Sequence, residues 1–195
     1  DLWFGIGDVS GHGVTPGLIM MMAQTVHTTI TTNYQASARD VVSMINRVLY
    51  KNVQGRLHED HFMTFTTLKY LGDGRFQHAG AHLDLIVYRQ RTRTCELIDT
   101  KGTWLNLMED IGYCTENLEF TLEVGDVLVL YTDGLTEAWD PNQEILDTPR
   151  FIDIVTTHAE QAIEHFRDAV IADVMEWGQG KQYDDMSLVL ARRVQ

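Results

Sequence analysis

The stretch Phe4–Gly13 reads FGIGDVSGHG, and the rest of the chain is organised around it. It overlaps a short apolar run, residues 2–6, that is typical of a buried strand. One carboxylate, Asp8, follows that run among glycines, which permit tight turns and close backbone approach. Thr15 and Pro16 then predict a helix start, with Thr15 as the N-cap. A carboxylate at the tip of a buried strand is expensive to desolvate, so we expect Asp8 to face a cation or a hydrogen-bond donor.

Two later stretches have the same character. Asp133 comes just after a continuous apolar run, and Asp184 and Asp185 directly precede another. Strand ends that each carry an aspartate can converge if their strands share a core. Clustered carboxylates repel one another, and hard divalent cations with oxygen ligands relieve that repulsion. The pattern therefore predicts a Mg²⁺ or Mn²⁺ site that includes Asp8.

The composition restricts the class of protein. A chain of 195 residues, 44% hydrophobic and 22% charged, fits one soluble domain with a sizeable core. The net charge of −13 argues against nonspecific binding to nucleic acid or to anionic membranes, which requires basic patches. Cys95 and Cys114 form neither a disulfide framework nor a zinc spacing, so we expect a reduced, cytoplasmic setting. No signal peptide is visible, and no apolar run approaches the roughly 20 residues of a membrane span.

Periodicity and turn signals predict the order of the elements. Helices are expected at residues 16–32, 37–52, 148–158 and 160–177. Strands are expected at residues 2–6, 62–71, 76–82, 83–89, 95–100, 118–123, 127–131 and 185–194. A capping box is expected at 37–40 and a hairpin turn at 72–74. Loops are expected at 54–59 and 135–147, and an irregular flap or lid at 102–116. Core packing is expected for Met20, Met21 and Met22. The order lacks βαβ alternation, which favours an α+β fold of packed antiparallel sheets with helices outside.

Several local groupings suggest other chemistry. Ser10 near His12 suggests a serine hydrolase, but the G-x-S-x-G pattern is absent, and nearness in sequence does not establish geometry. We interpret His12 as a residue that stabilises a turn or caps a helix rather than as a catalytic one. His78 and His82 have a helical zinc-ligand spacing but lie in a strand-like segment, which favours strand or loop positions. The polar turn 58–61 is interpreted as solvated rather than metal-binding.

Three motifs together resemble the signature blocks of the bacterial SpoIIE/RsbU-type phosphatases, a branch of the PP2C-like, metal-dependent serine/threonine phosphatase (PPM) superfamily. The three blocks are Gly7–Gly13, Tyr131–Glu137 and Tyr183–Ser187. A weaker fourth match is Ala79–His82, where the family usually reads Ala-Gly-His and this chain has Ala81 in place of the histidine. The resemblance implies a PP2C-like αββα sandwich, with two mainly antiparallel sheets flanked by helices, over residues 1–195.

The resemblance also implies a dinuclear Mn²⁺ or Mg²⁺ centre in the cleft between the sheets. By motif, Asp8 would bridge both ions and the carbonyl of Val9 would ligate one of them. Asp133 and Asp184 would hold the other ion, with Asp185 nearby. Two metal ions can activate a water, align it with phosphorus and neutralise the phosphate oxygens. No protein nucleophile is then required, and Asp8, Asp133 and Asp184 act through the metal-bound water.

Two departures from the superfamily pattern affect the site. PP2C-type enzymes place a histidine two residues after the first aspartate, where this chain has Ser10, as its bacterial branch does. The general acid is therefore unassigned, with His12 as a substitute candidate. The family also has an earlier strand with an acidic element, and Asp1 does not match that element. We expect the sequence to lack this first strand and one outer-shell metal ligand.

Three functions follow from these observations. The first is a phosphoserine/phosphothreonine phosphatase of bacterial signalling. By resemblance, its substrate is a phosphorylated STAS-type anti-sigma-factor antagonist in a partner-switching pathway, with sensor domains elsewhere in the full-length protein. The second is a catalytically weak or inactive signalling module that keeps the fold. The third is a metal-dependent hydrolase of small phosphate esters.

Overall fold

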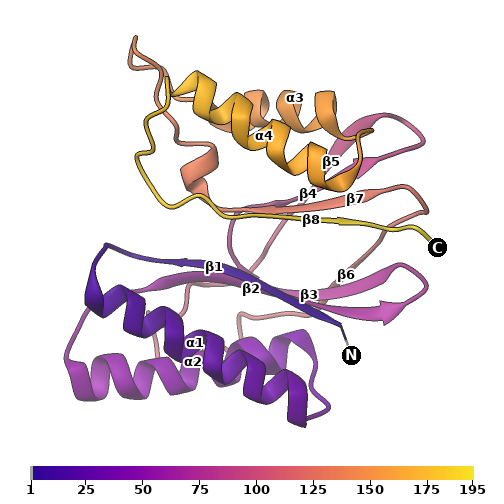
Figure 1. Ribbon diagram of the computed structural model, residues 1–195. Coiled ribbons are helices and arrows are strands. Elements are labelled where there is room, and N and C mark those ends of the chain that lie inside the picture. The colour runs from indigo at the N-terminus through magenta and orange to yellow at the C-terminus, as the bar shows by residue number, and fades with distance from the viewer. Residues whose placement is uncertain (1) are drawn as a thin grey trace. The chain divides into compact units, whose positions relative to one another are not determined.

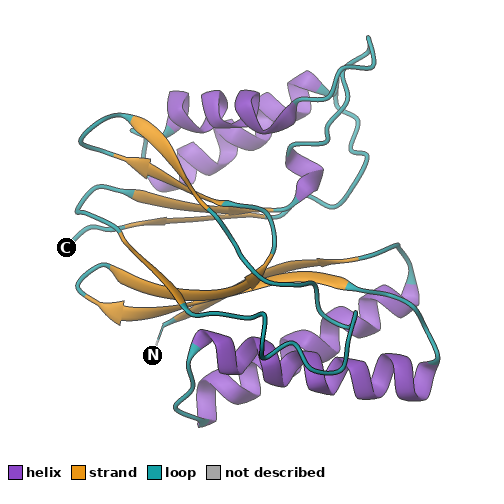
Figure 2. Ribbon diagram, turned by 180° about the vertical axis from the view of Figure 1, so that it is seen from behind, coloured by secondary structure: helices purple, strands orange, loops and turns teal. Residues whose placement is uncertain are grey.

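The computed structural model describes residues 2–195, and the chain divides into two compact units. Unit 1 comprises the chain up to His82 together with Thr100–Thr121, and unit 2 comprises Leu83–Asp99 and Leu122–Gln195. Each unit contains a four-stranded antiparallel sheet with two α-helices on one of its faces (Figure 1; Figure 2). The prediction of an α+β fold with antiparallel sheets and flanking helices is confirmed.

The sheet of unit 1 has the order β1-β2-β3-β6. Its strands are β1 (Trp3–Val9), β2 (Met63–Gly72), β3 (Arg75–Ala81) and β6 (Leu118–Thr121). The predicted hairpin turn at residues 72–74 joins β2 to β3, and all three of its residues have positive φ, as a Gly-Asp-Gly sequence allows. In the β1–β2 register Asp8 pairs with Thr64 and Val9 with Met63, so the motif aspartate lies at the end of an edge strand.

The helices of unit 1 are α1 (Val14–Asn33) and α2 (Ala38–Asn52), and the single π turn η1 (Val53–Leu57) follows α2. The expected capping box is present, because the Ser37 hydroxyl accepts from the Asp40 amide and the Asp40 carboxylate accepts from the Ser37 amide. η1 occupies part of the span expected to be a loop. The irregular segment 102–116 contributes an isolated bridge between Leu105 and Met63, and Leu105 and Ile111 are buried in the core of the unit.

Helix α1 differs from expectation at its start. It begins at Val14, and its N-cap is Gly13 with φ of 103°, so Thr15 is not the N-cap and Pro16 is the third helical residue. Proline is tolerated there because the first-turn amides have no partner within the helix. The sequence alone could not distinguish these starts, because the left-handed turn at Gly13 already sets the helix direction without a side-chain cap.

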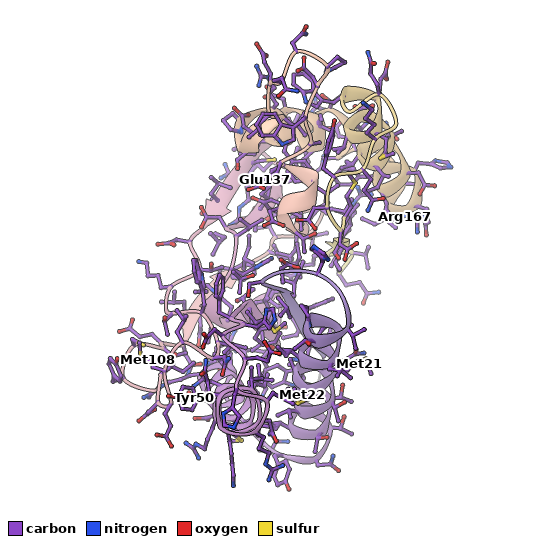
Figure 3. All side chains as sticks on the ribbon, turned by 90° about the vertical axis from the view of Figure 1, so that its left-hand side faces the viewer. Met21, Met22, Tyr50, Met108, Glu137 and Arg167 are labelled. Carbon is purple, nitrogen blue, oxygen red and sulfur yellow. The ribbon has the colours of Figure 1, made fainter. Side chains whose placement is uncertain are left out.

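The methionine run on α1 is only partly in the core. Met22 packs against the core of unit 1, whereas its neighbour Met21 is exposed (both are labelled in Figure 3). Met20 is exposed as well, so the expectation of core packing was wrong for Met20 and Met21. Three consecutive residues on a helix point in three directions, and α1 has only one face against the sheet. Among residues 2–195, no helix combines the length and the apolar character needed to cross a membrane.

Unit 2 is built on the sheet order β5-β4-β7-β8. Its elements are β4 (Leu85–Arg89), β5 (Thr94–Ile98), β7 (Val127–Tyr131), the 3₁₀ turn η2 (Asp133–Leu135), α3 (Asp147–His158), α4 (Ile163–Trp177) and β8 (Leu188–Arg192). α3 begins at Asp147, one residue before its expected start at 148, and the Asp147 carboxylate accepts from the Arg150 amide at 3.2 Å. All five residues of β7 are buried, and this central strand ends two residues before the motif aspartate Asp133.

Asp126 anchors the turn that leads into β7. The carboxylate is buried and accepts from the Arg89 guanidinium at 2.7 Å, the Gln90 amide at 3.0 Å and the Glu123 amide at 2.9 Å. We expect Asp126→Ala to lower the free energy of unfolding by about 2 kcal/mol, because three donors lose the buried carboxylate that accepts their hydrogen bonds. Arg89 retains its exposed partner Glu96, which limits the loss. Urea denaturation measures the change.

The matched control for this prediction is Glu96→Ala, which removes the exposed partner of the same arginine. The Glu96 side chain is 51% exposed, so the pair should contribute less than about 1 kcal/mol. An equal loss from both variants would show that the buried acceptor has no special role in unit 2.

Candidate metal centre

The end of β1 places Asp8 in close contact with β2. The Asp8 amide donates to the Thr64 hydroxyl at 3.2 Å, and that hydroxyl lies 2.9 Å from Nδ1 of His82. A Cβ added to Gly7 would lie 2.2 Å from the backbone oxygen of Thr64, so only glycine fits beside the aspartate. The Asp8 side chain is half-buried. This geometry explains why the motif has glycine immediately before its aspartate.

The turn after Asp8 is held by hydrogen bonds to Ser10. Its amide donates to the Phe62 carbonyl at 2.9 Å, and its hydroxyl accepts from the Phe62 amide at 3.0 Å. Its carbonyl accepts from Nδ1 of His61 at 2.7 Å. Ser10 thus has a structural role at the position where the wider superfamily has a histidine. His12 is exposed on the same turn.

His61 is a residue of this region that the sequence reasoning missed. It belongs to the turn interpreted as solvated, yet its imidazole lies on the motif turn. It is separated from Ser10 by 51 positions, and no spacing rule connects the two segments. Only the β1–β2 register, which pairs Val9 with Met63, brings them together.

In unit 2, two acidic segments lie backbone to backbone. Thr132 donates its amide to the Ser187 carbonyl at 3.1 Å, and its hydroxyl donates to the Asp185 carbonyl at 3.0 Å while accepting from the Ser187 amide at 2.9 Å. A Cβ added to Gly134 would lie 2.4 Å from the Asp185 carbonyl oxygen. The backbone of the turn that carries Asp133 therefore lies against the backbone of Asp184 and Asp185.

The acidic residues of unit 2 differ in exposure. Asp133 is half-buried at the start of η2, whereas Asp184 and Asp185 are exposed on the segment before β8. Burial raises the pKa of Tyr131 to about 12, and the nearby Asp84 carboxylate adds to the rise. The phenol at the end of β7 therefore stays neutral at physiological pH.

The predicted ligands belong to both units. Asp8 and Val9 lie in unit 1, and Asp133, Asp184 and Asp185 lie in unit 2. Within residues 2–195, no group of three or more His, Cys, Asp or Glu side chains is arranged to hold a metal ion. The donor chemistry still fits a hard divalent cation, because every predicted ligand offers oxygen. The close approach that Gly134 permits places two of the acidic segments in contact, as such a site requires.

The remaining candidate residues do not form metal groupings. His78 is buried on β3, edge-to-face with Phe120, which confirms a strand position. His82 comes directly after β3 and contacts Thr64. Cys95 and Cys114 are both free thiols of intermediate burial.

Comparison with known proteins identifies the family. The family described as Stage II sporulation protein E (SpoIIE) matches residues 1–194. The chain belongs to the SpoIIE family. One relative, the phosphoserine phosphatase RsbU of Bacillus subtilis (strain 168), is 27% identical over 191 residues, which cover 96% of this chain and 54% of RsbU. The chain therefore spans about half the length of this curated relative.

Solved structures show the same fold for this SpoIIE-family chain. The SiaA-PP2C domain of Pseudomonas aeruginosa superposes with a TM-score of 0.76 at 21% identity, over 97% of this chain and 75% of that one. The RsbU and RsbW domains of Rv1364c from Mycobacterium tuberculosis give a TM-score of 0.72 at 23% identity, over 98% and 52%. At this identity the likeness shows a PP2C-like fold.

Proposed function

We propose that this chain is a Mn²⁺- or Mg²⁺-dependent phosphoserine/phosphothreonine protein phosphatase domain. The observation that carries the proposal is the contact between the Asp133–Gly134 turn and Asp184–Asp185, a close approach that a side chain at Gly134 would block. Acidic segments held backbone to backbone need a cation to offset their repulsion. Membership of the SpoIIE family and the similarity to RsbU, a phosphoserine phosphatase, support the same function.

The chain's own residues have distinct roles in this proposal. Asp8, the Val9 carbonyl, Asp133, Asp184 and Asp185 would hold two ions. When bound, these ions would supply an activated water and neutralise charge on the phosphate. The half-buried Asp8 and Asp133 would attract the ions more strongly than the exposed Asp184 and Asp185, because water screens the charges of exposed carboxylates more effectively. No side chain is required as a nucleophile.

The proposed substrate is a phosphorylated STAS-type anti-sigma-factor antagonist. This choice rests on the family resemblance and on the similarity to RsbU and to a structure that contains RsbU and RsbW domains. The domain would act in a cytoplasmic partner-switching pathway, under control of sensor domains in the full-length protein, and without binding nucleic acid. The net charge of −13 agrees with a protein rather than a nucleic-acid partner.

Two measurements on the chain test the function. Calorimetric titration with MnCl₂ should show binding, and Mn²⁺ should then support release of phosphate from a phosphoserine-containing STAS protein. Chelation by EDTA should abolish the release. Absence of Mn²⁺ binding at millimolar concentration would favour the noncatalytic signalling module. Faster turnover of 4-nitrophenyl phosphate than of the phosphoprotein would favour a hydrolase of small esters.

A further inference from the structure

His61 is fixed on the turn that follows Asp8. Its Nδ1 lies 2.7 Å from the Ser10 carbonyl oxygen, and a Cβ added to Gly11 would lie 3.3 Å from the imidazole Cε1. The ring therefore packs on the Gly11 backbone. Nε2 lies 3.9 Å from the Glu59 carboxylate, and the side chain is 27% exposed.

The partner of Nδ1 determines which nitrogen carries hydrogen. A carbonyl oxygen can only accept, so Nδ1 of His61 must be the donor. Both the neutral Nδ1–H tautomer and the imidazolium satisfy this bond. The contact with Ser10 therefore does not depend on the charge of the ring.

A buried amide pair fixes the backbone of His61. The Asn106 side-chain amide donates to the His61 carbonyl, and the Asn106 backbone amide donates to Oδ1 of Asn46 at 2.8 Å. Asn46, on α2, also donates to the carbonyls of Met108 and Glu109. Both asparagines are at most 1% exposed. A hydrogen-bonded path therefore runs from α2 through Asn106 to the histidine on the motif turn.

The segment that carries Asn106 is attached to β2 as well. Leu105 and Met63 exchange two backbone hydrogen bonds, of 3.1 Å and 2.8 Å. Residues 105–109 are thus held on both α2 and β2. This part of the expected flap is anchored within unit 1 and holds the His61 carbonyl through Asn106.

Hydrogen bonds fix the orientation of two successive peptide planes after Asp8, those of Val9–Ser10 and Ser10–Gly11. The Ser10 N–H donates to Phe62 on the β2 side, and in a trans peptide the preceding C=O points the opposite way. The Val9 carbonyl is therefore directed away from β2. Met63 is the register partner of Val9, but its amide donates to the Leu105 carbonyl and not to the Val9 carbonyl. β1 is an edge strand, so the Val9 carbonyl points away from the strand that pairs with β1 in this sheet. His61 fixes the next peptide plane through the Ser10 carbonyl.

We propose that His61 is a positioning residue, which holds the Val9–Ser10–Gly11 backbone so that the Val9 carbonyl and the Asp8 carboxylate stay oriented for metal. The part of this inference that concerns metal binding rests on the proposed function. The part that concerns the order of the backbone rests only on the hydrogen bonds described above. Groups that orient metal ligands typically affect affinity by about 10- to 100-fold. His61 would act through backbone groups and would not touch the substrate.

The test exploits the shapes of amide side chains. In His61→Asn the side-chain nitrogen replaces Nδ1, whereas in His61→Gln it replaces Nε2 and reaches past Ser10. Calorimetry with MnCl₂ should show binding weakened about 10- to 100-fold in His61→Ala and His61→Gln and restored to within about threefold in His61→Asn. His58→Asn, an exposed histidine of the same turn with φ of 56°, is the matched control and should bind as the wild type does.

Hydrogen exchange gives a readout that needs no metal. In metal-free protein, the Ser10 amide should exchange about tenfold faster in His61→Ala and His61→Gln than in the wild type, with His61→Asn close to the wild type. Equal Ser10 exchange rates in all variants would overturn the inference. A wild type that binds no Mn²⁺ would refute the proposed function, and the exchange rates would still decide the role of His61.

Discussion

Asp8→Asn is expected to reduce Mn²⁺-dependent phosphate release from a phosphoserine protein by at least about 10³-fold, with the fold unchanged. Asparagine preserves the shape of the side chain but removes the negative charge by which carboxylates hold hard divalent ions. Metal stabilisation of a phosphoryl transition state amounts to several kcal/mol, and a loss of roughly 4 kcal/mol is a factor of 10³ in rate. Initial rates over a series of Mn²⁺ concentrations separate weaker binding from slower turnover.

The matched control for Asp8→Asn is Asp73→Asn. Asp73 lies in the hairpin turn of the same unit with φ of 52°, a conformation that asparagine adopts readily, and it is exposed. The chemical change is identical, so its rate should stay within about twofold of the wild type. If Asp8→Asn also released phosphate at the wild-type rate at saturating Mn²⁺, the proposed bridging role of Asp8 would be wrong.

Much of the fold could be predicted because its signals are local. The Ser37–Asp40 capping box uses groups three residues apart, and the 72–74 turn needs only residues that accept positive φ. The strand β7 is recognisable because all five of its residues are buried, which requires a continuous apolar run. In each case the interaction that determines the element lies within the element or directly beside it.

The helix starts show where local rules compete. The expected starts of α1 and α3 differ from the structure by two residues and one residue, and at α3 the Asp147 carboxylate accepts from the Arg150 amide. At α1 the N-cap is Gly13, so Thr15 is already the second helical residue and does not occupy the N-cap position. Met20 and Met21 are exposed for a related reason, because a run of identical residues carries no periodicity from which to choose the buried face.

The candidate site divides in the same way. The segments of Asp133 and Asp185 lie close together because they flank the paired ends of β7 and β8, and both segments are recognisable in the sequence beside apolar runs. His61 could not be predicted, because its contact with Ser10 depends on the β1–β2 register and on two buried asparagines from other segments. The proposed metal ligands lie in sequence motifs, whereas the proposed positioning role of His61 depends on tertiary contacts that no motif encodes.

Gly134→Ala is expected to lower the rate of phosphate release by about 10²-fold and the free energy of unfolding by about 2–3 kcal/mol. The new methyl group would lie 2.4 Å from the Asp185 carbonyl oxygen and 2.9 Å from its carbon, which are backbone atoms that cannot rotate away. The two segments must then separate, which strains the Thr132–Asp185 hydrogen bond and displaces Asp133 from Asp184. Overpacking typically costs about 1–3 kcal/mol, and a displacement of about 1 Å in a catalytic group can cost 10²-fold in rate.

The control for Gly134→Ala is the same substitution at a glycine with open space around it. Apart from its chain neighbours and the backbone of α1, nothing lies within 4 Å of a Cβ built on Gly17, so Gly17→Ala should raise stability by up to about 1 kcal/mol through helix propensity. Urea denaturation and initial rates on both variants are the measurements. The close approach of Thr132 and Gly134 to the Asp184–Asp185 backbone carries the proposed function, so a Gly134→Ala protein with wild-type stability and rate would remove its main support. A loss of stability without a loss of rate would assign Gly134 to the fold of unit 2 alone.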